Sequence, residues 1–406
     1  MSLLLDMQDK TAVLAHRFQQ LDRLLTDTRR WWQYQPYHHQ GLAFADEAPE
    51  LAARLNGLSL EEVMALDADM AALCTLLAPW IPAGQALHAL SELDAFLPEP
   101  IACTKGMAMY MPGRKQAQIE AFTGCLPPHG GPYLEWCAGK GHLGRLVSLQ
   151  RGADIISLEL QGALCEEGRL LAARDGARMQ FIEADAFAPA SGQLIAREHH
   201  AMALHACGEL HTHLLERVAE QGASGVTISP CCYHLIRGDQ YRPLSEAAAA
   251  SALRLGKSDL KLPLQETVTG GARIARLREQ EVVWRLAFDC LQRQLRGVDE
   301  YLPVPNMQKS LLTGGFEAFC GWAAERKGIR LPAGLDHAAF LARGEQRYGD
   351  VARMELVRHL FRRPLEIWLA LDRALFLQEH GYSVEVGEFC DKPMTPRNIL
   401  IRAVRA

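Results

Sequence analysis

The segment EWCAGKGHLG at residues 135–144 places three glycines where an apolar, strand-like run gives way to a helical pattern. Gly139 and Gly141 carry no Cβ, so they can adopt positive φ angles and bring main-chain N–H groups close to a ligand. A strand, a tight glycine turn and a helix form the first half of a βαβ unit. The segment therefore predicts a parallel sheet that binds a ligand at the carboxyl end of its first strand.

Short apolar runs alternate with amphipathic stretches through the middle of the chain, a pattern typical of βαβ units. They predict strands at 132–137, 154–159, 178–183, 200–205 and 225–229, with helices between them that include 164–173 and 210–220. Two further β-like runs, 382–389 and 398–404, end the chain. We therefore expect an α/β protein whose doubly wound sheet is completed by a C-terminal hairpin.

Helical periodicity dominates the two remaining zones of the 406-residue chain. Apolar residues recur at three- and four-residue spacing near the N-terminus, and the zone before the hairpin is rich in Ala, Leu and Arg. The predicted organisation is a helical N-terminal region at 1–100, a Rossmann-like core at 101–236, a helical insertion at 237–380 and a C-terminal β-hairpin at 381–406.

Charge and cysteine content exclude several classes of protein. The formal net charge is -5, from 43 basic and 48 acidic residues, so a polyanion would have to be held by a local basic patch. Eleven cysteines at irregular spacing do not form a disulfide framework. No stretch approaches the ~18 apolar residues of a membrane span, and the N-terminus lacks a signal peptide pattern. These features predict a cytoplasmic protein with no membrane partner.

Acidic residues follow three successive strands of the predicted sheet. Glu135 ends the first strand, Glu159 ends the second, and Asp185 follows the third. A pyrophosphate would be repelled by Glu135, whereas the ammonium group of S-adenosylmethionine would be attracted by it. Glu159 is placed to accept from ribose hydroxyls, and Asp185 from an adenine amino group. We expect a site for S-adenosylmethionine; the alternatives are solvated strand ends or the dinucleotide site of a dehydrogenase.

Several motifs occur in the order found in one known family. They are MPGRKQAQI at 111–119, EWCAGKGHLGR at 135–145, LHACGEL at 204–210, SPCCYH at 229–234, LDRALFLQE at 371–379 and TPRN at 395–398. The chain resembles a class I S-adenosylmethionine-dependent methyltransferase of the group that contains methyltransferase-like protein 25 and the ribosomal RNA adenine dimethylase domain-containing proteins. More distantly, it is similar to the tRNA ribose 2′-O-methyltransferases with a Cys-Cys-Tyr-His motif.

The resemblance implies a seven-stranded Rossmann-like sheet whose last strand is antiparallel, and a methyl transfer reaction within RNA modification. It implies S-adenosylmethionine as the cofactor, bound by Glu135, Cys137, Gly139, Gly141, Glu159, Asp185 and His205. Two departures from the family pattern stand out. Cys137 replaces the first glycine of the loop, and Ala117 and Gln118 replace a His-Glu pair, so we expect no catalytic residue in that helix.

The acceptor is expected to face the ends of the fourth and fifth strands. His205 lies at the first of these ends, and Tyr233 and His234 lie at the second. The Asn/Asp-Pro-Pro-aromatic signature that holds a planar amino group is absent, whereas a neutral imidazole suits a hydroxyl or a ring nitrogen. We therefore predict His234 or His205 as general base, with Tyr233 positioning or stacking on a flat substrate. The alternative is that these are structural side chains.

A metal site would compete for the same residues. Cys207, Cys231 and Cys232 could join His205 or His234 around a zinc ion. Adjacent cysteines do not easily reach one tetrahedral ion, however, and the chain has no Cys-x2-Cys pair there. We therefore expect no structural metal.

The partner predictions rest on the flanking zones. Six arginines at 343, 347, 353, 358, 362 and 363 either track phosphates or form a solvated face, and Lys105, Arg114 and Lys115 would add to such a surface. Trp31, Trp32, Tyr34 and Tyr37 either stack bases or, as we favour, pack the N-terminal helical region onto the main domain. RNA is the expected substrate. The alternatives are a protein or small-molecule acceptor, or a binding protein of this fold without chemistry.

Overall fold

The computed structural model describes residues 2–108, 111–265, 272–307 and 312–406. The chain forms two compact units, and each unit combines separate stretches of sequence. The first unit consists of Met1–Asp27, Leu87–Val268 and Arg362–Ala406, and the second of Thr28–Ala86 and Thr269–Phe361. In the part of the chain described here, no helix combines the length and apolar character needed to cross a lipid bilayer.

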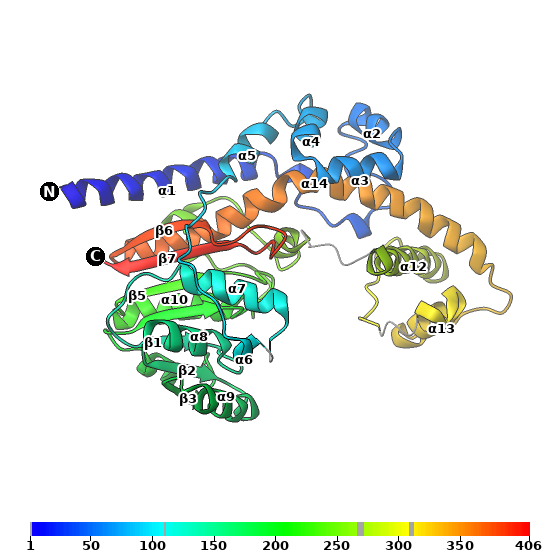
Figure 1. Ribbon diagram of the computed structural model, residues 1–406. Helices are drawn as coiled ribbons and strands as arrows, with labels where there is room; N and C mark the ends of the chain where they lie inside the picture. Colours follow the sequence, from blue (N-terminus) through cyan, green and yellow to red (C-terminus); the bar gives the residue numbers. More distant parts are fainter. Residues whose placement is uncertain (1, 109–110, 266–271, 308–311) are drawn as a thin grey trace. The chain divides into compact units, whose positions relative to one another are not determined.

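The first unit contains a seven-stranded sheet with the order β3-β2-β1-β4-β5-β7-β6 (Figure 1). Its strands are β1 (Tyr133–Trp136), β2 (Ile155–Glu159), β3 (Met179–Glu183), β4 (His200–Leu204), β5 (Gly225–Ser229), β6 (Tyr382–Glu388) and β7 (Ile399–Arg405). Neighbours among the first five strands pair in parallel, and β7 pairs antiparallel with both β5 and β6. The predicted Rossmann-like sheet with an antiparallel last strand is confirmed.

Central strands of the sheet are buried on both faces, which explains their continuous apolar sequences. All residues of β1 and β5 are buried, and so are the first four residues of β4. At the edge, Phe181 is the one buried residue of β3, and the others are exposed or partly exposed. Burial is therefore continuous in the central strands and partial at this edge of the sheet.

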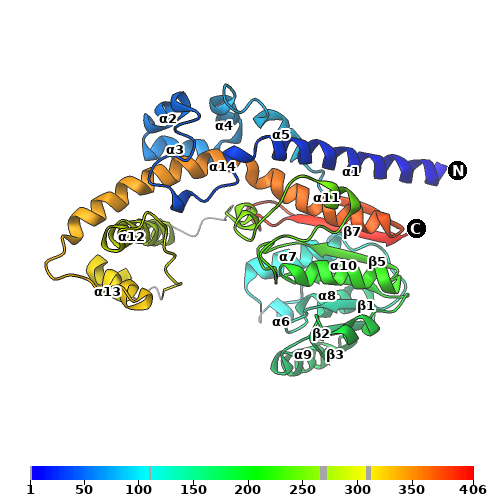
Figure 2. The ribbon, with the colours of Figure 1, turned by 180° about the vertical axis from the view of Figure 1, so that it is seen from behind.

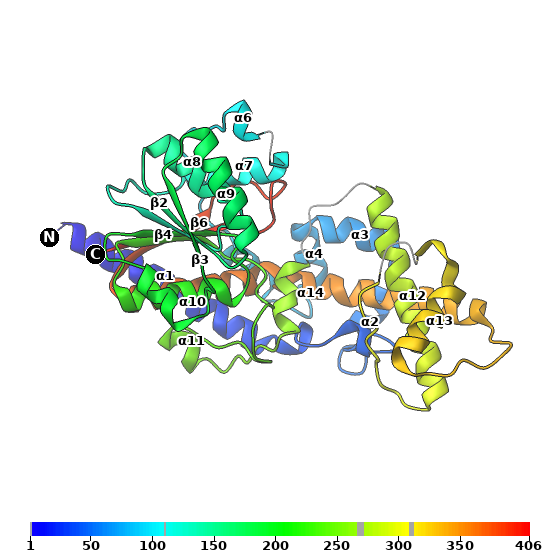
Figure 3. The same cartoon turned by 90° about the horizontal axis from the view of Figure 1, so that it is seen from below.

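Helices cover both faces of this sheet. The first unit contains α1 (Ser2–Asp27), α6 (Lys105–Ala108), α7 (Gly113–Gly124), α8 (His142–Arg151), α9 (Gly162–Asp175), α10 (Glu209–Gln221) and α11 (Glu246–Ala250), with 3-10 helices η3 (Pro189–Leu194) and η4 (Asp259–Leu264). Figure 3 shows α7 and α8 on one face and α10 on the other, and Figure 2 shows α10 in front of the strands. The helices predicted at 164–173 and 210–220 correspond to α9 and α10.

The hydrophobic core under α7 and α8 fixes the glycine turn against the sheet. Phe122 of α7 and Leu146 of α8 are fully buried together with Tyr133 of β1. The ring of Phe122 also meets that of Phe389, just after β6, edge-on at 6.1 Å between centroids. This packing joins the core of the sheet to the C-terminal hairpin.

The boundary between the two units falls within two helices, α5 (Gly84–Leu90) and the long α14 (His337–Glu379). The second unit adds α2 (Pro49–Asn56), α3 (Leu60–Ala68), α4 (Met70–Leu77), α12 (Ala272–Arg296) and α13 (Gly315–Lys327), with 3-10 helices η1 (Arg29–Trp31) and η2 (Pro36–His38). An aromatic core holds α12 to α13, because Trp284 lies 5.7 Å from Phe319 between ring centroids.

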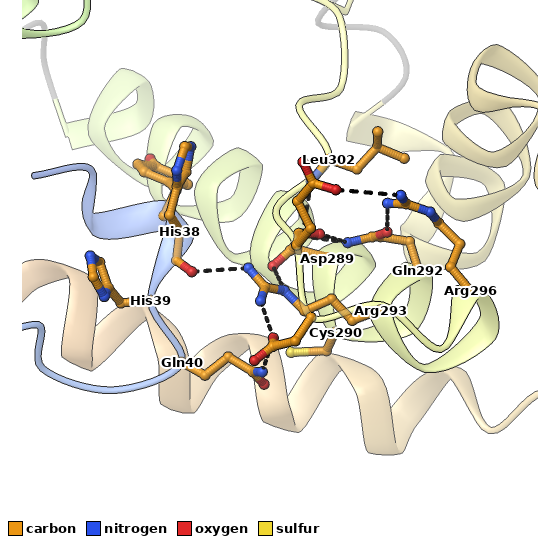
Figure 4. Close-up of polar contacts among 12 residues, drawn as sticks. His38, His39, Gln40, Asp289, Cys290, Gln292, Arg293, Arg296 and Leu302 are labelled. Carbon is orange, nitrogen blue, oxygen red and sulfur yellow. Dashed lines mark hydrogen bonds and ion pairs between the residues drawn. The ribbon is translucent and has the colours of Figure 1, made fainter.

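A buried carboxylate organises the polar interior of the second unit. Asp289 of α12 accepts hydrogen bonds from Arg293 (2.8 Å), Gln292 (2.8 Å) and Arg347 (2.6 Å). Figure 4 shows Arg293 reaching on from Asp289 to the carbonyl oxygen of His38, at 3.1 Å. These contacts bind α12 to the segment before α2.

The arginines of α14 are structural. In the second unit, Arg347 donates to the carbonyls of Tyr37 and His39, Arg353 to those of Leu55 and Leu58, and Arg358 to that of Trp32. In the first unit, Arg363 pairs with Glu366 and Glu388. The hypothesis that this stripe tracks phosphates is therefore wrong for these residues, because their guanidinium groups satisfy protein oxygens. Arg343 alone of the named six is an exposed residue.

The aromatic cluster near the N-terminus is part of a core, as we favoured over base stacking, but the contacts described below lie within the second unit and not on the Rossmann-like core. Trp31 and Trp32 are buried, and the ring of Trp32 lies 6.2 Å from that of Phe361. The hydroxyl of Tyr34 donates to the carbonyl of Met354 at 3.3 Å. Burial raises the pKa of Tyr34, which is consistent with a hydroxyl held inside the protein.

Candidate functional site

The predicted site residues lie at the carboxyl edge of the sheet, after β1, β2, β3, β4 and β5. Unusual backbone conformations mark the same edge. Among the described residues, three that are not glycine have a positive φ: Cys137 (57°), His205 (70°) and Cys232 (49°). They follow β1, β4 and β5 respectively. Such conformations cost free energy and concentrate at functional sites, so this edge is the candidate site of the unit.

The glycine turn is held by the carboxylate at the end of β2. Glu159 accepts from the main-chain N–H of Gly139 at 2.8 Å and from that of Gln161 at 3.0 Å. A Cβ on Gly141 would lie 2.5 Å from the ring of Phe181, whereas no atom lies within 4 Å of the corresponding position on Gly139. Gly141 is therefore packed against the sheet, and the backbone at Gly139 faces open space that a ligand can enter.

Glu135 lies inside the protein at the end of β1, with only 3% of its surface exposed. Its carboxylate accepts from the hydroxyl of Ser157 at 2.9 Å and is also hydrogen-bonded by the N–H of Gly144. Burial raises the pKa of Glu135 to about 7, while these hydrogen bonds and the Lys115 ammonium oppose the rise. A positive charge brought to this edge would favour the ionised carboxylate.

Asp185 is the most exposed of the three predicted acids. It lies two residues beyond β3 and accepts from the N–H of Phe187 at 2.9 Å. Glu159, in contrast, is buried and already holds two main-chain N–H groups. The three acids thus differ in the free protein. Glu135 is hydrogen-bonded to Ser157 and Gly144, Glu159 holds the glycine turn, and Asp185 is exposed to solvent.

The end of β4 is tied to α7 through a side chain that the sequence did not single out. His205 donates from Nε2 to Oε1 of Gln118 at 2.9 Å, and Nε2 of Gln118 donates to the carbonyl of Met394 at 3.2 Å. Gln118 is buried at 6% exposure, so its amide is fixed by these two partners. Desolvation lowers the pKa of His205, and the Lys115 ammonium lowers it further. The imidazole is therefore neutral near pH 7.

The two predicted residues after β5 differ sharply in their surroundings. Tyr233 is 1% exposed, and the guanidinium of Arg373 lies 5.2 Å from its ring centre. Its hydroxyl has no hydrogen-bond partner among the described residues. His234 is partly buried, and desolvation lowers its pKa below the ordinary value. Tyr233 packs under the strand end in this conformation, so contact of its ring with an acceptor stays a prediction, as does the base role of His234.

A comparison with protein families bears on this edge directly. The family model described as "Methyltransferase domain" matches residues 114–239, from α7 through β5 and the turn that follows. Residues 114–239 are therefore similar to a methyltransferase domain. None of the curated proteins compared with the chain matches it.

Residues beyond the matched segment complete the fold around it. The hydroxyl of Ser229 at the end of β5 donates to the carbonyl of Arg397 at 3.2 Å. Asp372 of α14 accepts from the hydroxyl of Tyr241 at 2.6 Å and from both the N–H (2.7 Å) and the hydroxyl (2.7 Å) of Ser245. The motifs at 371–379 and 395–398 thus hold the segment after β5 in place, which gives them a structural role.

Sequence reasoning missed Gln118 and Ser157 as parts of this site. Gln118 was set aside because it departs from the family pattern, yet its position in the motif at 111–119 was the signal. Ser157 is two residues before Glu159, so strand alternation places the two side chains on the same face of the sheet. Its partner Glu135 lies on the adjacent strand, opposite Ser157 in register, and only strand pairing reveals this contact.

Replacing Cys137 with glycine is expected to raise the free energy of unfolding by about 0.5–1 kcal/mol. Its φ of 57° costs a residue with a Cβ about 1–2 kcal/mol, and the greater freedom of glycine in the unfolded chain offsets part of that gain. Urea unfolding of the two proteins measures the difference. Cys137→Ala is the matched control, because it removes the thiol and keeps the Cβ. An equal gain in both variants would assign the effect to the thiol.

Proposed function

We propose that this chain is an S-adenosylmethionine-dependent methyltransferase that acts on RNA, with a histidine at the acceptor edge as general base. The observation that carries the proposal is the pair of buried acids, Glu135 and Glu159, on either side of a glycine turn whose backbone at Gly139 faces open space. These groups lie in a methyltransferase domain, at the strand ends where folds of this kind bind ligands.

The proposed roles follow from the chemistry of the cofactor. Glu135 attracts the ammonium of the methionine part, and the main chain at Cys137, Gly139 and Gly141 receives that part of the molecule. Glu159 accepts from the ribose hydroxyls with the lone pairs that the turn leaves free. Asp185 accepts from the adenine amino group, and His205 lines the site near the transferred methyl group. The cofactor supplies the electrophilic methyl group, and this chain binds and orients both reactants.

RNA is proposed as acceptor because the motif order resembles that of RNA-modifying methyltransferases and because exposed cations lie at the acceptor edge. Arg114 and Lys115 are exposed in the first turn of α7, whose buried Gln118 contacts His205. Positive charge at a helix N-terminus is unfavourable to the helix itself. Lys115 lies near Glu135, whereas the exposed Arg114 is better explained by an anionic partner. The side chain of Lys105 lies outside the described part of the chain.

The proposed function is tested with radiolabelled S-adenosylmethionine and the purified full-length chain. RNA, protein and small-molecule fractions come from cells that lack the protein, and a heat-denatured sample of the chain is the control. We expect label in RNA. Label confined to protein or to small molecules would reject the RNA acceptor, and absence of label in every fraction would reject the enzyme in favour of a binding role.

Replacing Glu135 with alanine is expected to weaken S-adenosylmethionine binding by about 10- to 100-fold, because a hydrogen bond to a charged group contributes ~1.5–3 kcal/mol. Calorimetry measures the affinity. Glu166→Ala, at an exposed acid of α9 in the same unit, is the control and is expected to bind like the parent. A Glu135→Ala protein with unchanged affinity would contradict the ammonium contact.

The same calorimetry yields the pH dependence. The pKa of Glu135 is about 7 in the free protein, and a bound cation lowers it, so binding releases protons near pH 7. Affinity is therefore expected to rise with pH between about 6 and 8 in the parent protein. In Glu135→Gln, which cannot ionise, this rise is expected to disappear. A parent affinity that falls over this range would have the wrong sign for the proposal.

A further inference from the structure

Three cysteines converge at the carboxyl ends of β4 and β5. The sulfur atoms of Cys207, Cys231 and Cys232 all lie within 4.8 Å of one another, and those of Cys207 and Cys231 are 3.6 Å apart. Within the described ranges, this is the group of three or more His, Cys, Asp or Glu side chains with donor atoms close enough to share one ion. The remaining eight cysteines are spread through both units.

The spacing of the sulfur atoms matches that of a tetrahedral zinc site. Zinc–thiolate bonds are about 2.3 Å long, which places two sulfur ligands of a tetrahedral ion about 3.8 Å apart. The observed 3.6 Å and the upper limit of 4.8 Å bracket this separation. No large movement is needed for all three sulfur atoms to reach one ion.

The backbone at Cys232 explains how two adjacent cysteines face the same point. Successive side chains of an extended chain point to opposite sides. Cys232 has a φ of 49°, and this left-handed conformation turns its side chain to the side of Cys231. Adjacent cysteines do not easily reach one ion when the backbone is extended, and the backbone at Cys232 is not extended. A strained conformation at a residue with a Cβ also requires compensation, which metal–thiolate bonds at Cys232 would provide.

The surroundings suit a negatively charged metal centre. Three thiolates and one divalent ion carry a net charge of -1. Arg397 is close enough to Cys232 to stabilise negative charge on its sulfur. In the free protein the Cys207 thiol donates to the carbonyl oxygen of His205 at 3.4 Å, and this proton leaves when the sulfur binds a metal ion. The cluster is therefore held by turns from two strands, with one cationic side chain beside it.

We propose that Cys207, Cys231 and Cys232 form a zinc site with three thiolate ligands and an open fourth position. Binding forms three zinc–sulfur bonds, and the three thiol protons leave to solvent. Three protein ligands with one open position are the pattern of zinc ions that bind a further ligand, whereas closed four-ligand sites are structural.

The test begins with the zinc content of the full-length chain, purified without chelators or metal-affinity steps. Inductively coupled plasma mass spectrometry is expected to find about one zinc per chain. The variants Cys207→Ser, Cys231→Ser and Cys232→Ser are each expected to lose most of it. Cys125→Ser is the matched control, because Cys125 is buried in the same unit and outside the cluster. It is expected to retain the parent's zinc.

A second measurement keeps the proposal testable if a variant does not fold. The parent chain is stripped with a chelator, and zinc(II) is added back while alkylation of native thiols is followed by mass spectrometry. Zinc is expected to protect Cys207, Cys231 and Cys232 from alkylation by tenfold or more and to leave Cys103 and Cys390 unchanged. Alkylation of the three cysteines that does not depend on zinc would overturn the site.

The remaining outcomes separate this proposal from its rivals. A disulfide between Cys207 and Cys231 in chain purified without reductant would assign the cluster to redox chemistry and overturn the zinc site. Zinc that persists in a variant lacking all three thiols would place the ion elsewhere and also overturn it. Cofactor binding is measured independently. A chain that binds S-adenosylmethionine and no zinc would reject this site alone, and a zinc-bound chain without methyl transfer would reject the proposed function alone.

Discussion

Replacing Asp289 with alanine is expected to lower the free energy of unfolding of the second unit by about 3–5 kcal/mol. Arg293 and Arg347 are 7% and 5% exposed, and both donate to this carboxylate. Removing it leaves two guanidinium charges inside the protein without their common partner, and the loss of one member of a buried pair has a cost of this size. Gln292 and the N–H of Leu302 also lose an acceptor.

Urea unfolding followed by circular dichroism measures this change, and hydrogen exchange assigns it to the second unit. Asp299→Ala is the matched control. Asp299 pairs with the same Arg293, but its side chain is 74% exposed and water replaces it. The control is expected to leave the free energy of unfolding nearly unchanged. Equal losses in the two variants would show that burial of Asp289 does not decide its contribution.

Replacing the general base with alanine is expected to lower the rate of methyl transfer by about 10²- to 10⁴-fold while cofactor affinity stays the same. The candidates are His234 and His205, so each is replaced separately. Desolvation lowers the pKa of both imidazoles, which keeps them neutral and able to accept a proton near pH 7. His88→Ala, at an exposed position of α5 in the same unit, is the control.

The pH profile identifies the base. The rate in the parent is expected to rise with pH through an apparent pKa below the ordinary 6.5 of histidine and to be level above neutrality, because the neutral imidazole is the active form. The variant that loses both the rate and this rise identifies the base. If each variant retains the parent's rate, neither histidine takes the proton.

Gln118→Leu separates positioning from proton transfer, since it removes the hydrogen-bond partner of His205 and leaves both imidazoles in place.

Much of the sheet could be predicted from the sequence because strands and helices have local signatures. The apolar runs at 132–137 and 225–229 became β1 and β5, and the final strand at 398–404 became β7. The location of the site followed in the same way. Acids such as Glu135 and Glu159 follow strands, and the carboxyl ends of parallel strands meet at one edge. These inferences need only short-range patterns and one general rule of α/β folds.

Side-chain environments could not be predicted in this way. The arginines of α14 had the pattern of an exposed stripe, yet Arg347 and Arg358 are buried and bonded to main-chain carbonyls of segments some 300 positions away. Tyr233 had the pattern of a substrate contact and packs beneath Arg373. In each case the partner comes from a distant part of the sequence, so the spacing of neighbouring residues carries no information about it.

The sequence by itself determined the order of strands and helices, the glycine turn at 139–141 and the acids that follow the first three strands. Hydrophobic periodicity and backbone freedom are properties of adjacent residues, and they act before any tertiary contact forms. Tertiary structure alone decided that Gln118 holds His205 and that three cysteines from two loops meet within 4.8 Å. The cysteine cluster depends on the pairing of β4 with β5 and on the positive φ at Cys232, and the Gln118 contact depends on the packing of α7 against the sheet.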